Sequence, residues 1–537
     1  YINNKNIPEI EQIYPLTDKI TNKMIRNTIY KILNDMKEVK LCDIVGELEQ
    51  SNIINKIKLS FKQCLYEIHN AKNEHILSPN SQFIEQLALY EILSEQIVLK
   101  EISKNNDNIR TPIQKNFNLK EYYLKRLPFN LTKAQEKVIF EIENDIFSNK
   151  SMLRLLQGDV GSGKTIVAFL TMLPFLENKK QVAIMCPTSI LAEQHYSFFK
   201  KNNINVGLLV GGIKQKKQLL QKIENGDIDV IIGTHAIFQD KVKFKELGYV
   251  IVDEQHRFGV SQRLELINKG YKTDTLIMSA TPIPRTLSLS IYNGISLSII
   301  DEKPKNRKDI ITVLIQKNKI LELIQKIKNK IEQSEKVYWI CPLIDENEGN
   351  NVISVNERYN ILKTYFEDGL EILHGDMDEN KKNKILENFA IGNTKILVST
   401  TVVEVGIDVA DATIIVIENP ERFGLSQIHQ LRGRVGRGEK QSYCVLFYEN
   451  CGENFKKRME VLRNTNDGFK IAEEDLKLRG KGEIIGNKQS GMQMRIANLQ
   501  FHYDLFLSVN KIIDNIANYD NLLKIFYNDK MTRDNLG

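Results

Sequence analysis

Residues 158–165 read GDVGSGKT, the spacing of a phosphate-binding P-loop. The apolar run 152–156 precedes them and a helix-like stretch follows, which is the strand–loop–helix context that this motif requires. Glycines let backbone N–H groups surround phosphate oxygens, Lys164 would neutralise the β- and γ-phosphates, and Thr165 would ligate Mg²⁺. The candidate nucleotide-binding residues are Gly158, Gly161, Ser162, Gly163, Lys164 and Thr165. We therefore expect a site for a nucleoside triphosphate and magnesium.

Two adjacent carboxylates, Asp253 and Glu254, follow another apolar run at residues 249–252. Asp253 at the end of a strand would hold Mg²⁺ through water, and Glu254 would polarise the water that attacks the γ-phosphate. Acidic pairs after strands also occur as simple helix caps. The P-loop in the same chain favours the catalytic interpretation, so we expect hydrolysis of the triphosphate.

A third group of chemical residues lies far away in sequence, at residues 430–437, which read QLRGRVGR. Arginine presents a planar cationic fork to phosphate oxygens, so Arg434 and Arg437 would supply positive charge at the γ-phosphate, next to Gln430. The alternative is a basic patch that binds nucleic acid. We favour the first interpretation because the segment occurs together with the P-loop and the Asp-Glu pair. The active site would then assemble only when two domains close.

The elements that position these residues are short apolar runs that alternate with longer amphipathic stretches. This alternation is typical of a parallel sheet covered by helices. Ligands of open α/β sheets bind outside the carboxyl ends of the strands, where the polar motifs fall. The predicted fold class is therefore α/β with two tandem parallel sheets. The predicted strands lie at residues 182–185, 230–232, 249–252 and 275–278 in the first series, and at 337–340, 396–398, 414–417 and 443–447 in the second.

We expect four domains. Residues 1–117 form a helical linker region, in which Ile25, Ile29, Ile32, Leu33 and Met36 share one helical face and no site chemistry is visible. Residues 118–305 form the nucleotide-binding domain and residues 306–452 the second α/β domain. Residues 453–537 form a C-terminal helical module.

The composition limits the function further. A length of 537 residues excludes a single small module. The 74 Lys and Arg against 68 Asp and Glu give a net charge of +6, a mild basic balance that is compatible with nucleic acid. Six scattered cysteines without a CxxC pair indicate buried thiols rather than disulfides or a zinc site. No apolar run is long enough to cross a bilayer, so we expect a cytoplasmic protein with no membrane partner.

The motifs taken in order resemble those of superfamily 2 helicases: the P-loop, DEQH at residues 253–256, SAT at 279–281 and QLRGRVGR. Longer strings, including DEQHRFGVSQR, SATPIPRTL, ENPERFGLSQIHQLRGRVGR and NDGFKIAEEDLKLRGKGE, are similar to those of the RecG family of bacterial branched-DNA helicases. This resemblance covers about residues 129–498. It implies two RecA-like domains, ATP and Mg²⁺ as cofactors, and duplex and branched DNA as partners. It also implies a role in DNA repair and recombination, and a chain that acts as a monomer on DNA.

The resemblance also assigns further residues. Phe129 and Gln135 match an adenine-recognition motif, in which Gln135 would read the base edge and Phe129 would pack near the ring. Thr132 in the same segment would also serve as a helix cap. Gly406 and Asp408 match a loop near the nucleotide ribose. Residues 466–491 match a translocation motif that converts domain closure into a step along duplex DNA.

One departure from the family limits the expected activity. The family carries an oligonucleotide-binding wedge before its helicase domains, whereas the resemblance here begins in the linker that follows the wedge. We therefore expect the wedge to be absent and fork unwinding to be weak. Two alternatives stay open: a translocase of the transcription-repair coupling type, and a truncated DNA-binding remnant with weak unwinding.

Overall fold

The computed structural model describes residues 10, 12–15, 20–38, 40–41, 43–44, 59–105, 112–211, 216–239, 241–253, 273–280, 295–304, 308–342, 354–401, 409–449, 452–478, 494–498 and 501–527. The chain divides into two compact units. The helical unit comprises Tyr1–Asn105, Arg285–Ile295 and Met492–Gly537, and the two-sheet unit comprises Asn106–Pro284 and Ser296–Gly491. In the described part of the chain, no helix has both the length and the apolar character needed to span a membrane.

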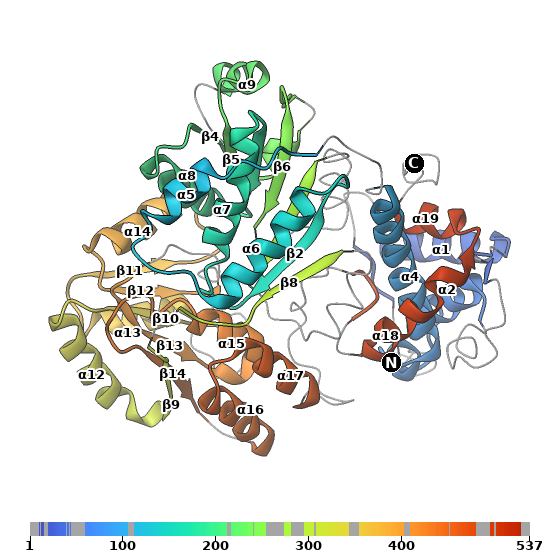
Figure 1. Ribbon diagram of the computed structural model, residues 1–537. Helices are drawn as coiled ribbons and strands as arrows, with labels where there is room; N and C mark the ends of the chain where they lie inside the picture. Colours follow the sequence, from blue (N-terminus) through green and yellow to red (C-terminus); the bar gives the residue numbers. More distant parts are fainter. Residues whose placement is uncertain are drawn as a thin grey trace. The chain divides into compact units, whose positions relative to one another are not determined.

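The helical unit is organised around one long helix, α4 (Gln82–Asn105), against which α2, α18 and α19 pack (Figure 1). The remaining elements are α1 (Asn22–Asp35), α2 (Phe61–His69), α3 (Glu74–Leu77), α18 (Tyr503–Ile512), α19 (Asp520–Tyr527) and the antiparallel pair β1 (Asp43–Ile44) and β15 (Ile516–Ala517). The predicted helical character of this region is confirmed. The predicted apolar face of α1 is wrong at Ile32, which is 57% exposed, whereas its neighbour Leu33 is buried.

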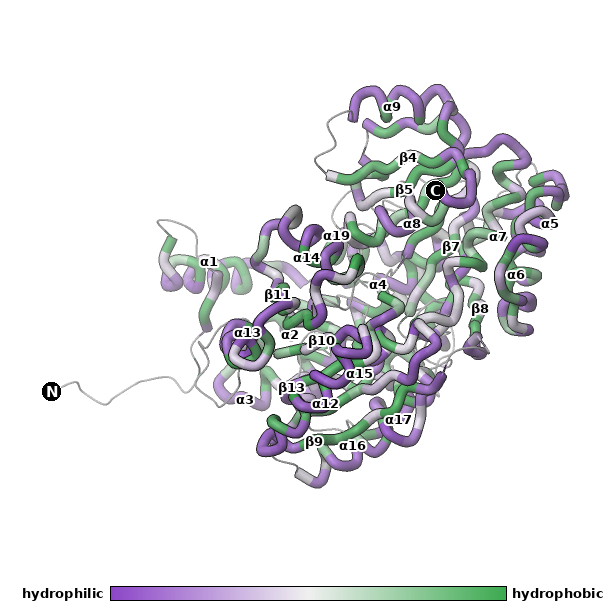
Figure 2. Tube along the Cα trace, turned by 90° about the vertical axis from the view of Figure 1, so that its left-hand side faces the viewer, coloured by the Kyte–Doolittle hydropathy of each residue, from purple (hydrophilic) through white to green (hydrophobic). Residues whose placement is uncertain are grey.

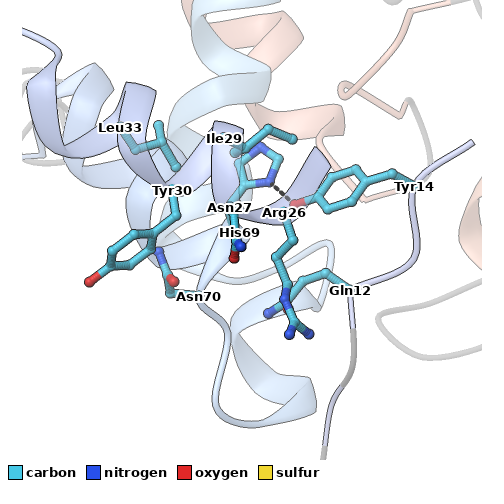
Figure 3. A pocket seen from close by; sticks show the side chains of 9 residues that line it. All are labelled: Gln12, Tyr14, Arg26, Asn27, Ile29, Tyr30, Leu33, His69 and Asn70. Carbon is cyan, nitrogen blue, oxygen red and sulfur yellow. Dashed lines mark hydrogen bonds between the residues drawn. The ribbon is translucent and has the colours of Figure 1, made fainter. Parts of the chain in front are cut away.

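A polar cavity of about 210 Å³ lies in the helical unit, lined by residues of α1, the end of α2 and the segment 12–15 (Figure 3). The hydroxyl of Tyr14 lies 2.7 Å from His69 Nδ1, and the Tyr14 main-chain N–H donates to Asn22 Oδ1 at 3.0 Å. Burial raises the pKa of Tyr14 and lowers that of His69. These contacts hold the N-terminal segment against α1 and α2.

The first sheet of the two-sheet unit contains seven parallel strands among the described residues, in the order β4-β5-β3-β6-β7-β2-β8. The strands are β2 (Leu153–Gly158), β3 (Gln181–Met185), β4 (Val206–Leu209), β5 (Val230–Gly233), β6 (Leu247–Val252), β7 (Asp274–Ser279) and β8 (Ser296–Ile300). The helices are α5 (Asn118–Leu124), α6 (Lys133–Ile146), α7 (Lys164–Glu177), α8 (Ser189–Lys201) and α9 (Lys216–Asn225). Figure 2 shows β4 and β5 as largely hydrophobic and α9 as largely hydrophilic, which is the pattern of a buried sheet under a solvated helix.

The second sheet contains six parallel strands among the described residues, in the order β11-β12-β10-β13-β14-β9. The strands are β9 (Ile311–Gln316), β10 (Lys336–Ile340), β11 (Leu370–Leu373), β12 (Ile396–Ser399), β13 (Ala412–Glu418) and β14 (Tyr443–Tyr448). The helices are α12 (Ile320–Glu332), α13 (Val355–Lys363), α14 (Glu379–Ile391), α15 (Leu425–Arg432), α16 (Glu453–Asn464) and α17 (Gly468–Leu478). The predicted α/β fold class is confirmed, because both series of predicted strands form parallel sheets with helices between the strands.

Candidate nucleotide-binding site

The P-loop connects β2 to α7, as its sequence context predicts. Strand β2 is buried along its whole length, and α7 begins at Lys164 with Gly163 as its N-cap. Gly163 has a φ of +88°, and a β-carbon there would stand 2.2 Å from Gln135 Nε2. Only glycine fits this position, since both the left-handed backbone and the close side chain exclude a β-carbon. The first N–H groups of α7 are thereby available at the loop, where they favour an anion.

The side chain of Lys164 folds back onto the loop. Its Nζ donates to the carbonyl oxygens of Gly158 at 2.8 Å and Asp159 at 3.1 Å, and the residue is buried. Thr165 follows it in the first turn of α7 and is half-buried. A positive charge and a hydroxyl therefore lie at the helix N-terminus, which is the arrangement that phosphate binding requires.

Gln135 is engaged at both ends of its amide. Its Oε1 accepts from the main-chain N–H of Thr132 at 2.9 Å, and its Nε2 donates to the carbonyl of Ser162 at 2.8 Å. Thr132 in turn accepts from the Gln135 N–H, which completes a capping box at the start of α6 and confirms Thr132 as a helix cap. Reading an adenine edge with the same amide would require one of these bonds to be exchanged. Phe129 is 49% exposed, so its ring is accessible for packing against a base.

Asp253 directly follows β6 and is buried. Its Oδ2 lies 3.0 Å from Nε2 of His195, which is itself buried on α8. No local pattern in the sequence distinguishes His195, because a single histidine in an amphipathic stretch carries no signal of a functional role. The contact fixes the orientation of the Asp253 carboxylate. The neighbouring Glu254 lies outside the described residues.

The sheet order brings the P-loop and Asp253 to the same edge. Parallel strands β2 and β6 both end there and are separated only by β7, whose last residue is Ser279. Neighbouring strands lie about 4.8 Å apart, so the two groups are separated by about 10 Å along the edge. A triphosphate held by the loop would therefore be close enough to Asp253 for one metal ion, with its waters, to connect the two.

The donors at this edge suit magnesium. The Thr165 hydroxyl and the Asp253 carboxylate are oxygen ligands, which Mg²⁺ prefers. Within the described part of the chain no group of three or more His, Cys, Asp or Glu side chains could hold a metal ion by itself. The ion would therefore be shared with phosphate oxygens and keep several waters, as is usual for Mg²⁺ at triphosphate sites.

The arginine-bearing segment of the second sheet lies against the P-loop. Helix α15 ends at Arg432, and its C-cap Gly433 packs on Val160: a β-carbon on Gly433 would stand 2.7 Å from Val160 Cβ. Arg434 and Arg437 follow at once, half-buried, and Arg437 Nε donates to the Gly433 carbonyl at 3.5 Å. Gln430, on the last turn of α15, is also half-buried. The segment that carries these three residues therefore lies beside the P-loop at Val160.

A second contact between the two sheets' domains involves Asp159 and His429, which the sequence analysis did not single out. Asp159 Oδ1 lies 2.6 Å from His429 Nε2, and Asp159 Oδ2 lies 3.5 Å from Lys303 Nζ. Burial would raise the pKa of Asp159, but the contacts with His429, Lys303 and the Val160 N–H outweigh it and hold that pKa well below its usual range. Burial lowers the pKa of His429, and the negative charge of Asp159 raises it by a smaller amount. The pair is thus a neutral histidine that donates to a carboxylate.

Other residues assigned by the sequence fall outside the described part of the chain. These are Gly406 and Asp408 of the predicted ribose loop, and residues 479–491 of the predicted translocation motif. The described part of that motif comprises α17 and the residues before it.

Three family descriptions match the sequence in tandem. Residues 132–289 match the DEAD/DEAH box helicase domain, and residues 297–439 match the helicase conserved C-terminal domain. Residues 465–532 match the C-terminal part of domain 3 of the ATP-dependent DNA helicase RecG. The first helicase match covers six of the seven described strands of the first sheet, and the second covers five of the six described strands of the second sheet.

Two bacterial RecG proteins are similar to most of the chain. The ATP-dependent DNA helicase RecG of Aquifex aeolicus is 45% identical over 511 residues, which cover 87% of this chain and 63% of that protein. RecG of Bacillus subtilis is 40% identical, with 92% of this chain and 73% of that protein covered. The chain therefore spans less than two thirds of the length of the Aquifex protein.

A solved structure of RecG bound to a three-way DNA junction matches with a TM-score of 0.67 and 39% sequence identity. The match covers 93% of this chain and 66% of that one. The agreement extends over the helical unit as well as both sheets, because it leaves only a small share of the chain unmatched.

Proposed function

The chain belongs to the RecG family of DNA helicases, and from this membership we propose that it hydrolyses ATP in order to move along duplex DNA and remodel branched DNA. The proposal concerns activity in DNA repair and recombination, with Mg²⁺ as the ion that accompanies ATP. It places the chain in the cytoplasm as a monomer on its DNA.

One observation carries the proposal: the packing of Gly433 on Val160. Through this contact the arginine-bearing segment of the second sheet lies against the P-loop of the first. A P-loop alone indicates only nucleotide binding. In a motor protein, a second domain adds arginines to the nucleotide site of the first. The presence of the γ-phosphate then changes the contacts between the two domains.

The residues take the following roles in the proposed reaction. Lys164 moves from the carbonyl oxygens of the loop to the β- and γ-phosphates, while Thr165 and Asp253 hold the magnesium ion. The ion neutralises charge on the phosphate oxygens. Glu254 orients and polarises the attacking water, and Gln430 orients the same water from the other domain. Arg434 and Arg437 stabilise the negative charge that develops on the transferred phosphoryl group.

Nucleotide contacts outside the phosphates are assigned by the family's motifs. Phe129 packs beside the adenine ring and Gln135 reads its edge, after exchange of one of the two hydrogen bonds that its amide makes. Gly406 and Asp408, which are outside the described residues, would contact the ribose. Gly158, Gly161, Ser162 and Gly163 provide the loop that surrounds the phosphates.

The proposed partner is branched duplex DNA, bound without sequence preference. The solved relative that is bound to a three-way DNA junction supports this choice. Contacts to the phosphate backbone hold position and carry no base information, so affinity falls steeply as salt rises. A fork, a three-way junction and a linear duplex of equal length are the informative substrates.

Steady-state phosphate release from ATP by residues 1–537 tests the proposal. Release should rise when a three-way junction is added and rise less with linear duplex or single-stranded DNA. Lys164→Ala should abolish release, and Glu254→Gln should bind ATP with Mg²⁺ yet hydrolyse it slowly. Release that is indifferent to every DNA, or unaffected by Lys164→Ala, would contradict the proposal.

A further inference from the structure

The polar cavity of the helical unit is lined by three separate segments of the chain (Figure 3). Gln12 and Tyr14 come from the N-terminal segment, and His69 and Asn70 come from the end of α2. The other lining residues lie between positions 26 and 33 of α1. None of them belongs to the candidate nucleotide-binding site, which lies in the other compact unit. The cavity therefore needs an interpretation of its own.

The wall that is formed by the N-terminal segment is fixed by hydrogen bonds within the chain. The Asn22 side chain bonds this segment twice: its Oδ1 accepts from the Tyr14 N–H at 3.0 Å, and its Nδ2 donates to the Gln12 carbonyl oxygen at 2.7 Å. The Tyr14 hydroxyl lies 2.7 Å from His69 Nδ1, which ties the same wall to α2. A ligand of the cavity does not have to order this wall, so little affinity is lost to ordering it.

Three rings line the cavity and suit a flat ligand. The rings of Tyr14 and His69 stack with their centroids 5.9 Å apart and their planes inclined by 20°. Tyr30, on α1, lies on the side away from Tyr14 in Figure 3, and it is 49% exposed. Aromatic side chains bind nucleobases of any sequence by stacking, because every base has a π face.

The charge of the lining favours an anionic group. Arg26 is the cation among the nine lining residues, and none of the nine is Asp or Glu. Burial lowers the pKa of His69, so its ring is neutral at neutral pH. Burial raises the pKa of Tyr14, and the charge of Arg26 lowers it by less, which places the guanidinium near the Tyr14 hydroxyl. A guanidinium presents a planar fork that matches phosphate oxygens.

The carboxamides and the volume restrict the ligand further. Gln12, Asn27 and Asn70 supply both donors and acceptors, which the edges of nucleobases also carry, although Asn70 Nδ2 uses one N–H on the Tyr66 carbonyl oxygen at 2.9 Å. A cavity of about 150 Å³ holds benzene. The cavity here, about 210 Å³, thus has room for one nucleobase but not for a base together with its sugar and phosphate.

We propose that this cavity binds one nucleotide, with the base among the three rings and the phosphate at the rim on Arg26. Two sources share this chemistry: an unpaired nucleotide of a DNA strand, and a free nucleotide. The strand as source rests on the proposed function, because branched DNA brings unpaired bases to the chain. The chemistry of the cavity itself is independent of the P-loop.

Photocrosslinking to the 537-residue chain tests the proposal and distinguishes the two sources. One probe is a short oligothymidine strand that carries a single iodouracil, and the other is iodo-deoxyuridine monophosphate. In both arms a non-hydrolysable ATP analogue with Mg²⁺ occupies the P-loop, and cross-linked peptides are identified by mass spectrometry. We expect cross-links at Tyr14, Tyr30 or His69. Cross-links from the strand identify DNA as a source, whereas cross-links from the monophosphate alone identify a free nucleotide.

Competition by thymidine and by thymidine monophosphate measures the role of Arg26. In the unsubstituted chain the monophosphate should compete about 10- to 100-fold better, which is the value of a hydrogen bond to a charged group. Arg26→Gln should remove this preference. Arg126→Gln is the matched control and should keep it, since the Arg126 guanidinium also stacks on a tyrosine, 3.7 Å from the Tyr122 ring centroid, but does not line the cavity.

Tyr30→Ala keeps the proposal testable if Arg26→Gln does not fold. This variant removes a ring that is half exposed, so the fold should persist. It should lower cross-linking of both probes at the remaining rings by at least about 5-fold, because a stacking surface for the base is lost.

Several results would overturn the proposal. These are the absence of cross-links at the three rings with both probes, equal competition by thymidine and its monophosphate, and unchanged cross-linking in Tyr30→Ala. An equal loss of preference in Arg126→Gln and Arg26→Gln would do the same. Phosphate release from ATP is measured on the same preparations. Its absence would contradict the proposed function alone, since cross-linking of the monophosphate does not depend on hydrolysis.

Discussion

Gly433 belongs to the domain of the second sheet and Val160 to the domain of the first sheet. The two residues touch so closely that no side chain fits between them. A β-carbon on Gly433 would stand 2.7 Å from Val160 Cβ and 2.8 Å from its Cγ1. The position is helical at the C-cap of α15, so the glycine is required by space and not by its backbone angle. This contact sets how near the arginine-bearing segment lies to the P-loop.

Gly433→Ala should therefore separate the two segments and impair hydrolysis. A displacement of about 1 Å at a catalytic group costs about 100-fold in turnover, and nucleotide affinity should change little because the P-loop itself is intact. The measurement is phosphate release beside analogue binding. Gly452→Ala is the control, since a β-carbon there meets nothing within 4 Å. Normal turnover in Gly433→Ala would show that the close packing is not needed.

His195→Ala should weaken magnesium binding without removing a metal ligand. The His195 ring holds the Asp253 carboxylate at 3.0 Å, and loss of such a supporting partner typically costs about 10- to 100-fold in metal affinity. A Mg²⁺ titration of ATP-analogue binding measures the shift directly. His195→Gln keeps a side-chain donor and should shift the titration less. Identical Mg²⁺ titrations for all three proteins would rule out a positioning role for His195.

Arg434→Ala and Arg437→Ala should each lower turnover while analogue binding is largely retained. Arginines that stabilise a transferring phosphoryl group are worth about 10³- to 10⁵-fold in rate in other systems. Single-turnover hydrolysis and analogue binding are measured on the same preparations. If both variants lose only affinity for DNA, the segment is a basic DNA-binding patch and not part of the hydrolytic site.

The neutral state of His429 should make folding sensitive to acid. Its pKa lies below the ordinary value of 6.5, because burial and the cations of Arg432 and Lys303 outweigh the attraction of Asp159. As the pH falls through about 6.5, the unfolded chain takes up a proton at this histidine more readily than the folded chain does, so stability falls as the pH falls. The low pKa of Asp159 acts in the same direction only at lower pH, below about 4.

Thermal unfolding midpoints at pH 7.5 and 5.5 test this. The unsubstituted chain should lose more of its midpoint temperature on acidification than His429→Gln, which has no titratable group at this position. His502→Gln removes a buried histidine of the helical unit and controls for the general loss of such a residue. Equal pH dependence in the unsubstituted chain and His429→Gln would mean that His429 does not titrate differently in the two states.

The fold was largely predictable because its signals are local. Each apolar run that was predicted as a strand, such as residues 249–252 and 414–417, is buried in a parallel sheet. The P-loop was predictable for the same reason, since its glycines, lysine and flanking elements are contiguous. Ile32 was misplaced because periodicity gives the direction of a side chain but not what lies opposite to it.

The contacts that complete the site were not predictable from one sequence. Asp253 and His195 are 58 residues apart, and Asp159 and His429 are 270 residues apart. Such pairs depend on the order of strands in each sheet and on how the domains pack, which no local pattern specifies. The motif at Gln135 indicated a ligand contact and a local helix cap at Thr132, whereas the bond from Gln135 to Ser162 depends on tertiary structure.

The most direct test of the account is displacement of a third DNA strand from a triplex by residues 1–537, since only movement along duplex DNA removes that strand. Displacement should require both ATP and Mg²⁺, should fail with a non-hydrolysable analogue, and should be lost in Lys164→Ala. Displacement that persists in Lys164→Ala would contradict the account. So would its complete absence in a chain that hydrolyses ATP in response to DNA.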